Sequence, residues 1–241
     1  MSRVLQTGVA RVITRASGVS IALVLGVATI SAQQPNVLSA AETSGGWQLL
    51  FDGTTLNGWR GFKSAEPPAG WQAADGAIVR VGGPGDLMTA EQYGDFELRL
   101  EWQIVAGGNS GIMFHVTGDG AQTYETGPEF QVLHNAGHAD GKNPLTSAGS
   151  NYAVLAPVRD VTRPVGEWNE IRLLVKGAHV EHWMNGVKLL EYELWSPDWE
   201  ARVAASKFGK MPGYGRARRG YIVLQEHGAQ VSYRNIKIKK L

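Results

Sequence analysis

Cysteine is absent from the 241-residue chain. Without cysteine the protein can form no disulfide bond, no thiolate nucleophile and no cysteine-ligated zinc site, so the packing of the core must hold the fold together. The chain also contains no Gly-x-Ser-x-Gly elbow, no phosphate-binding loop and no dinucleotide fingerprint. These absences leave Ser/His/Asp catalysis without support, and we expect no nucleotide or organic cofactor.

A surplus of charge of one sign is missing as well. The chain has 23 basic and 22 acidic residues. A nucleic-acid partner requires a strongly basic surface, so we expect no nucleic acid among the partners of this protein.

Long hydrophobic runs are scarce. One apolar run, Val19–Ile30, follows three arginines and precedes the small residues Ser31 and Ala32. It is short for crossing a bilayer, and the arrangement is typical of a signal peptide over residues 1–32. We therefore expect an exported protein, periplasmic or secreted, with no transmembrane segment in the mature chain. A retained N-terminal anchor is the alternative.

Glycine and tryptophan are plentiful by contrast, at 31 and 8 residues. Residues 33–46 are small and polar and are predicted to form a flexible lead-in, and residues 47–241 to form one domain. In that domain Asp75-Gly76 and Asn185-Gly186 separate apolar runs, which is a strong signal for β-hairpins. The run Phe96–Ile104 alternates apolar and polar residues, as a half-buried strand does.

Further strands are predicted at regular spacing along the chain. They are residues 110–116, 129–134, 168–176, 180–194, 221–225 and 231–238. One segment has helical spacing instead: Pro197–Phe208, with Ser196 as N-cap and Trp199 and Val203 on one side. This pattern predicts an all-β, jelly-roll sandwich of two antiparallel sheets with one short helix.

Two strands carry candidate chemistry. In the first, the period of two puts Glu129 and Gln131 on one face, where they can bind sugar hydroxyls or act as a base and its partner, or simply face solvent. In the second, Gln225, Glu226 and His227 end an apolar strand, a frequent place for catalytic groups, although an ordinary polar strand end is the alternative. Adjacent residues of a strand point to opposite faces, so Glu226 and His227 are not expected to reach the same ligand atom.

The six histidines show no His-x-x-x-His spacing. A scattered set of Glu129, His134 and Glu226 is the candidate site for a divalent metal ion. His182, which flanks the start of a strand, is expected at the surface. Lys207 ends the predicted helix, where it either favours the helix C-terminus or binds a carbonyl or hydroxyl oxygen.

Several stretches, in order from about Trp47 to Leu241, resemble the 3-keto-disaccharide hydrolase domain family. They are Leu50–Gly53, Leu56–Trp59, Phe96–Trp102, Gly108–Ile112, Glu125–Leu133, Asn135–His138, Gly166–Asn169, His182–Gly186 and Gly220–Gly228. The resemblance implies a concanavalin-like or laminin-G-like sandwich that processes glycosides already oxidised at C3. A C3 ketone acidifies the C2 proton, so a base can remove it, the C1 oxygen is expelled, and water adds back.

The resemblance also implies roles for residues of this chain. Catalytic roles fall to Glu129, Glu226 and His227, and substrate binding to Asn109, Ser110, Gln131, His138, Lys207 and Gln225. The chain departs from the family pattern at His134 and Glu226, where members commonly have Asp, which alters the reach of any ligand to a metal. A non-catalytic carbohydrate-binding module and a structural domain of the cell envelope are the alternative functions.

Overall fold

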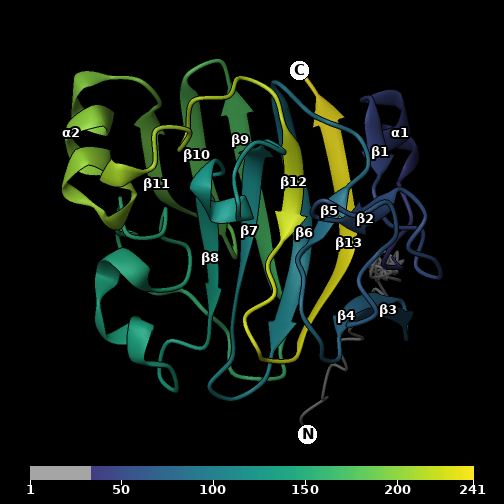
Figure 1. The fold of residues 1–241 in the computed structure, drawn as a ribbon. Coiled ribbons are helices and arrows are strands. Elements are labelled where there is room, and N and C mark those ends of the chain that lie inside the picture. The colour runs from purple at the N-terminus through teal and green to yellow at the C-terminus, as the bar shows by residue number, and fades with distance from the viewer. Residues whose placement is uncertain (1–33) are drawn as a thin grey trace, which may run out of the picture. The chain divides into compact units, whose positions relative to one another are not determined.

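The computed structural model describes residues 34–241, and the predicted signal peptide lies outside them. Two antiparallel sheets face each other (Figure 1). The five-stranded sheet has the order β2 (Trp59–Gly61), β5 (Leu87–Thr89), β12 (Tyr221–Leu224), β7 (Asn109–Val116) and β8 (Glu129–Leu133). The eight-stranded sheet has the order β11 (Val187–Glu193), β10 (His179–Met184), β9 (Asn169–Lys176), β6 (Phe96–Ile104), β13 (Val231–Lys240), β4 (Ala77–Arg80) and β3 (Trp71–Ala74), with β1 (Trp47–Leu49) paired to β13. The predicted jelly-roll sandwich is confirmed.

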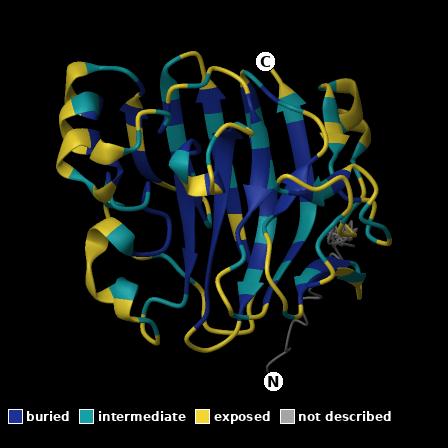
Figure 2. Ribbon diagram, in the orientation of Figure 1, coloured by how far each residue is buried: buried dark blue, intermediate teal, exposed yellow. Residues whose placement is uncertain are grey.

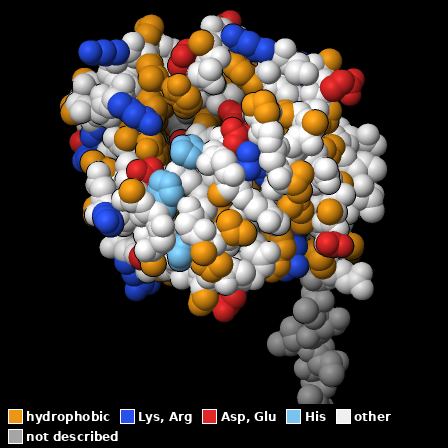
Figure 3. Space-filling view, turned by 60° about the horizontal axis from the view of Figure 1, so that its bottom comes forward, with side chains coloured by type: hydrophobic (Ala, Val, Ile, Leu, Met, Phe, Trp, Pro, Cys, Tyr) orange, Lys and Arg blue, Asp and Glu red, His pale blue; other side chains and the backbone are white. Residues whose placement is uncertain are grey.

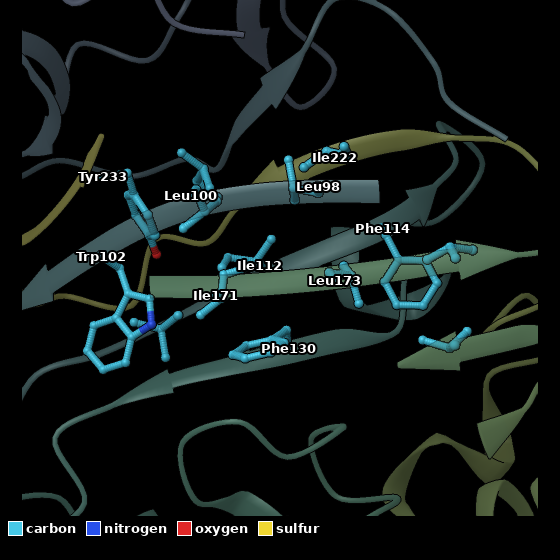
Figure 4. Close-up of a cluster of buried hydrophobic side chains, with 14 of the residues drawn as sticks. Leu98, Leu100, Trp102, Ile112, Phe114, Phe130, Ile171, Leu173, Ile222 and Tyr233 are labelled. Carbon is cyan, nitrogen blue, oxygen red and sulfur yellow. The ribbon is translucent and has the colours of Figure 1, made fainter. Parts of the chain in front are cut away.

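The core lies between the two sheets. Strand β6 buries Phe96, Leu98, Leu100 and Trp102 on one face and leaves the alternate residues partly exposed, as its sequence predicted. Side chains from β6, β9 and β13 meet side chains from β7, β8 and β12 (Figure 4). The strands are buried while the surrounding loops and helices carry most of the exposed residues (Figure 2). Burial of this apolar area is what stabilises a domain that has no disulfide.

Two of the turns follow directly from the sequence. Asp75 and Gly76 have φ of 51° and 73° between β3 and β4, and Asn185 and Gly186 have φ of 49° and 78° between β10 and β11. Positive φ at both central residues defines the two-residue turn that best matches the twist of a hairpin, and Asn, Asp and Gly tolerate it best.

The predicted helix is present as α2 (Pro197–Ala205). Ser196 caps it by accepting a hydrogen bond from the backbone N–H of Trp199 at 3.2 Å. Trp199 and Val203 are buried, as their spacing predicted. A 3-10 helix, η4 (Lys207–Lys210), follows at once. Three shorter 3-10 helices lie in loops: η1 (Thr123–Glu125), η2 (Ala139–Lys142) and η3 (Pro144–Thr146). Among residues 34–241 no helix is long and apolar enough to cross a membrane.

The sequence did not predict a second α-helix, α1 (Ala40–Ser44), within the supposed flexible lead-in. Ser39 and Glu42 form a capping box, with the backbone N–H of Ser39 donating to the Glu42 carboxylate at 2.8 Å. Glu42 also pairs with Lys237 of β13, and the Asn36 amide donates to the carbonyl of Gly76 at 2.8 Å. These contacts attach the segment to the eight-stranded sheet, so the prediction of a flexible lead-in was wrong for residues 36–46.

The surface position expected for His182 was also wrong. Its ring is fully buried, stacks on Phe130 at a centroid distance of 4.7 Å, and bonds through Nδ1 to the carbonyl of Gly149 at 3.1 Å. Burial lowers the pKa of His182 to about 3, so the ring is a neutral member of the core.

Candidate active site

The floor of the site is the outer face of the five-stranded sheet, which carries an apolar row beside a polar row. The strand register places Met88, Val223 and Met113 next to one another across β5, β12 and β7, and Glu129 of β8 opposite Met113. These methionines and Val223 are buried and form a small apolar cluster of their own. Glu129 therefore stands where the apolar row ends.

The polar row lies one step further along the same strands. Gly111 of β7 pairs with Gln131 of β8, and its carbonyl accepts a hydrogen bond from the backbone N–H of Gln225 at 2.9 Å. Asn109 follows at the next position of β7 on this face. Because side chains alternate along a strand, the amides of Asn109, Gln131 and Gln225 share the face that carries Glu129.

A cleft of about 650 Å³ opens above this floor. In the space-filling view the face is hollowed, with charged and histidine side chains gathered around the hollow (Figure 3). The cleft is lined by Phe62, Lys63, Pro84, Gly85, Asp86, Asn109, Ala121, Gln122, Tyr124, Glu129, Gln131, Tyr152, Lys207, Gln225, Glu226 and His227. Its walls thus come from loops that are far apart in the sequence.

Glu129 is a buried carboxyl group, with 4% of its surface exposed. A Cβ built on Gly111 would lie 2.1 Å from Glu129 Oε1, so the carboxyl occupies space that only glycine leaves free. No hydrogen bond from residues 34–241 reaches this carboxyl. Burial raises the pKa of Glu129 to about 8; Lys207 opposes the rise, and the charges of Asp86 and Asp140 add to it. Such a group is suited to accept a proton near neutral pH.

The three amides beside Glu129 are incompletely satisfied. Asn109 Oδ1, Gln131 Oε1 and Gln225 Oε1 are buried and find no hydrogen-bond partner in the part of the protein that the structure describes. Gln131 does use its amide N–H, which donates to the carbonyl of Thr146 at 3.2 Å. Buried amides with spare capacity, grouped in one cleft, are suited to bind the hydroxyl groups of a polar ligand.

Asp86 joins two walls of the cleft. Its carboxylate accepts hydrogen bonds from the backbone N–H of Glu226, at 2.7 Å, and from the hydroxyl of Thr123 in η1. Burial raises the pKa of Asp86. The residue thus positions the loop after β12 against the η1 segment.

Glu226 is held by an ion pair. Its Oε1 lies 2.6 Å from Nη2 of Arg80, which is 5% exposed, and accepts a second hydrogen bond from the backbone N–H of Gly228 at 2.6 Å. Two donors on one carboxylate oxygen hold the Glu226 side chain in place at the cleft. His227 is exposed at the rim, where its ring meets the ring of His138 edge to face at 6.4 Å.

Lys207 reaches the cleft from the start of η4. Its Nζ lies 4.2 Å from the centroid of the Tyr152 ring and 5.1 Å from that of Phe208. Lys207 is an exposed residue, yet desolvation of its ammonium group against the cleft wall lowers the pKa of Lys207, while Glu129 and Asp140 act in the opposite direction.

A ladder of aromatic rings supports this lysine. Tyr192 of β11 stacks on Trp199 of α2 at 5.0 Å, Trp199 lies 6.1 Å from Tyr214, and Tyr214 stacks on Phe208 at 4.0 Å. The rings are nearly parallel and all are buried, so α2 and η4 are fixed against the edge of the eight-stranded sheet.

The structure brings together most of the residues that the sequence singled out. The cleft is lined by Asn109, Glu129, Gln131, Lys207, Gln225, Glu226 and His227. Glu226 and His227 both reach it, because they lie in the loop after β12 rather than on the strand itself.

Three predicted residues, Ser110, His138 and His134, are not among those that line the cleft. Ser110 is fully buried and bonds to the carbonyl of Gln225 and the hydroxyl of Tyr233, each at 2.7 Å, because it is one residue out of phase with Asn109 and faces the core. His138 is not among the residues that line the cleft, and its Nδ1 caps η2 by accepting from the backbone N–H of Asp140, but its ring contacts that of His227 at the rim. We therefore withdraw the prediction that Ser110 contacts the substrate, while a contact from His138 stays a prediction.

His134 was expected to ligate a metal together with Glu129 and Glu226, and the geometry contradicts this. Its Nδ1 accepts a hydrogen bond from the backbone N–H of Gly107 at 2.9 Å, and the ring lines a different cavity, beside Trp102. Glu226 is already ion-paired with Arg80, so these three side chains do not form a metal site.

Within residues 34–241 one group of three side chains is compact enough to share an ion: His179, Glu181 and Glu191 on the eight-stranded sheet. Glu181 is paired with Arg172 and Glu191 with Lys188, each at 2.7 Å. This group is therefore an ion-pair network outside the cleft.

The sequence reasoning missed Asp86, Phe62 and Tyr124. Asp86 stands just before a short strand and has no distinctive spacing, and the two aromatic residues lie in loops. Tyr152 lies in the long loop between β8 and β9, which reaches the cleft. The length of that loop is the one signal in the sequence that points to it, because long loops in compact domains are often functional.

A β-sandwich with a carboxyl group and unpaired amides in an open cleft belongs to the class of sandwich proteins that bind or convert polar small molecules. The comparisons with known proteins narrow this class. Residues 46–239 match the 3-keto-alpha-glucoside-1,2-lyase-like domain, and the chain belongs to this family of glycoside-acting proteins.

Relatives agree with this assignment. A Bacteroides thetaiotaomicron protein named 3-keto-disaccharide hydrolase is 34% identical over 245 aligned residues, which cover 88% of this chain and 84% of that protein. A crystal structure of a Parabacteroides distasonis protein, named as a candidate glycosyl hydrolase, is 37% identical, has a TM-score of 0.81 and covers 86% of this chain and 100% of its own. A second such structure from the same species is 28% identical with a TM-score of 0.64, covering 81% of this chain and 99% of its own.

Proposed function

We propose that this protein is an exported enzyme that cleaves 3-keto-glycosides to 3-ketoglucose and a free aglycone. The family and the name of the Bacteroides relative support the type of substrate. The observation that carries the proposal is Glu129, a buried carboxyl group without a hydrogen-bond partner among the described residues, on the floor of a polar cleft. Export is proposed from the apolar pattern of residues 1–32.

In this reaction the ionised carboxylate of Glu129 takes the proton from C2, next to the C3 ketone. The electron pair left on C2 then forms a double bond to C1 and expels the aglycone oxygen, which takes up a proton. Water adds across the new double bond and restores the sugar as 3-ketoglucose. The net change is hydrolysis, and no second carboxylate at a fixed distance is needed.

The other cleft residues have roles that follow from their environment. The amides of Asn109, Gln131 and Gln225 would bind sugar hydroxyls, and Lys207 would lie near the ketone. Glu226 is engaged by Arg80, so the exposed imidazole of His227 at the rim would give the proton to the leaving oxygen.

The test uses a 3-keto-disaccharide and its unoxidised parent as separate substrates, with release of 3-ketoglucose or of its unsaturated elimination product as readout. We expect turnover of the keto sugar alone. Glu129→Gln should abolish it, whereas Glu66→Gln, which changes an exposed glutamate, should not.

The binding-module alternative makes a different prediction. If no keto sugar is turned over, and an unoxidised glycan binds saturably both to the wild type and to Glu129→Gln, the enzyme proposal is wrong. The cleft would then be a recognition site without chemistry.

A further inference from the structure

Lys207 differs from the ion-paired lysines of this protein in its surroundings. Lys188, Lys237 and Lys240 each pair with a glutamate. Lys207 Nζ has neither an ion pair nor a hydrogen bond within residues 34–241, although it lines the same cleft as Glu129. Its Nζ lies over the rings of Tyr152, Phe208 and Tyr124.

The backbone that carries this amine is fixed by packing. Phe208 is 1% exposed and is clamped by Tyr214, so the residue next to Lys207 cannot shift without disrupting the ladder of rings. Ser206 caps η4 by accepting from the backbone N–H of Phe208 at 3.1 Å. An amine that stands unpaired in a cleft, over aromatic rings and on a backbone fixed by packing, has the properties of a lysine that attacks carbonyl groups.

We propose that Lys207 forms an iminium ion with the C3 carbonyl of the substrate, an inference that rests on the proposed function. The amine nitrogen adds to C3, and the carbonyl oxygen leaves as water. An ammonium group and a ketone thereby become an iminium ion and one water molecule, with no proton gained or lost overall. Water reverses this step after cleavage and restores the ketone and Lys207.

The iminium ion serves the proposed chemistry directly. A positively charged nitrogen at C3 withdraws electrons from C2 more strongly than a neutral ketone does, so the C2 proton becomes easier to remove. The electron pair then moves into an enamine rather than onto an enolate oxygen. The iminium nitrogen supplied by Lys207 thus stabilises the negative charge that develops when the C2 proton is removed.

Trapping with cyanoborohydride tests the covalent bond. The Glu129→Gln variant is incubated with methyl 3-keto-glucoside, which has no reducing end and which this variant should not cleave, so no free sugar aldehyde is released to modify other lysines. Cyanoborohydride reduces an iminium ion to a stable amine, which intact-mass analysis detects and peptide mapping locates. The unoxidised methyl glucoside is the substrate control.

The expected result is one added sugar on the peptide that contains Lys207. Lys207→Met in the same background should lose it, and Lys210→Met, which changes an exposed lysine of the same 3-10 helix, should keep it. Absence of the adduct, or labelling spread equally over surface lysines, overturns the inference.

Turnover by otherwise wild-type variants gives an independent readout. Lys207→Arg keeps the positive charge but cannot form the iminium ion, so it should be as inactive as Lys207→Met. If Lys207→Arg retains most of the activity, Lys207 acts through its charge and the inference is wrong. The proposed function is judged separately, because wild-type turnover without an adduct contradicts only the iminium ion.

Discussion

Replacing Glu129 by Gln should change how the stability of the protein depends on pH. The pKa of Glu129 is raised in the native state, from 4.5 to about 8. Its contribution to stability is therefore complete below pH 4.5 and is lost as the pH rises toward 8, because the unfolded chain releases this proton first. At about 1.4 kcal/mol per pKa unit, the wild type should lose about 3 kcal/mol of unfolding free energy from this group between pH 5 and pH 8.

Gln has nearly the same shape and does not titrate, so the variant should not show this loss. Urea unfolding of the wild type, Glu129→Gln and Glu66→Gln at pH 5 and pH 8 measures it. Other titrating groups are common to all three proteins and cancel in the comparison. We expect Glu129→Gln to gain about 3 kcal/mol relative to the wild type on going from pH 5 to pH 8. Parallel pH dependences for the wild type and Glu129→Gln would refute the claim that Glu129 is buried and shifted.

Three further predictions concern the same cleft. The pH profile of kcat/KM should rise as the pH increases toward about 8, since Glu129 must be ionised to accept the C2 proton, and a rise complete by pH 6 would contradict the role of this group. Gly111→Ala should lower kcat by at least about 10-fold and destabilise the fold by about 1–3 kcal/mol, because the added Cβ displaces the Glu129 carboxyl. Activity assays and urea unfolding measure the two effects. Unchanged activity would show that the position of the carboxyl does not matter. Arg80→Met should destabilise the protein by about 2 kcal/mol in urea, because Glu226 loses its partner while remaining three-quarters buried; an unchanged midpoint would mean that solvent already screens the pair.

Local pattern predicted much of the sandwich. The alternation of Phe96–Ile104 and the Asn185-Gly186 turn depend on neighbouring residues only, and both are present as expected. Helix α1 escaped prediction because its five residues depend on the ion pair between Glu42 and Lys237, and these two residues are far apart in the sequence.

The site was only partly predictable, because local pattern fixes which face a side chain takes but not what covers that face. Strand period placed Glu129 and Gln131 on one face, but that face could equally have been solvated, and only the distant loops that roof it make it a cleft. Period also distinguishes Asn109 from Ser110, yet the family resemblance treated both as contacts. Asp86 could not be predicted, because its role comes from hydrogen bonds with Thr123 and Glu226, which are distant in the sequence.

The ladder of rings beneath Lys207 limits how this cleft can be rebuilt. Phe208 and Trp199 belong to η4 and α2, the segment that carries Lys207 to the cleft, whereas Tyr192 belongs to β11 of the eight-stranded sheet. If α2 and η4 are exchanged between relatives, they will therefore pack correctly only when Tyr192 and Tyr214 are exchanged with them. In a chimera that transfers α2 and η4 alone, Trp199 and Phe208 would pack against rings that do not match them. The fold would then be destabilised by the same change that was meant to alter substrate selectivity.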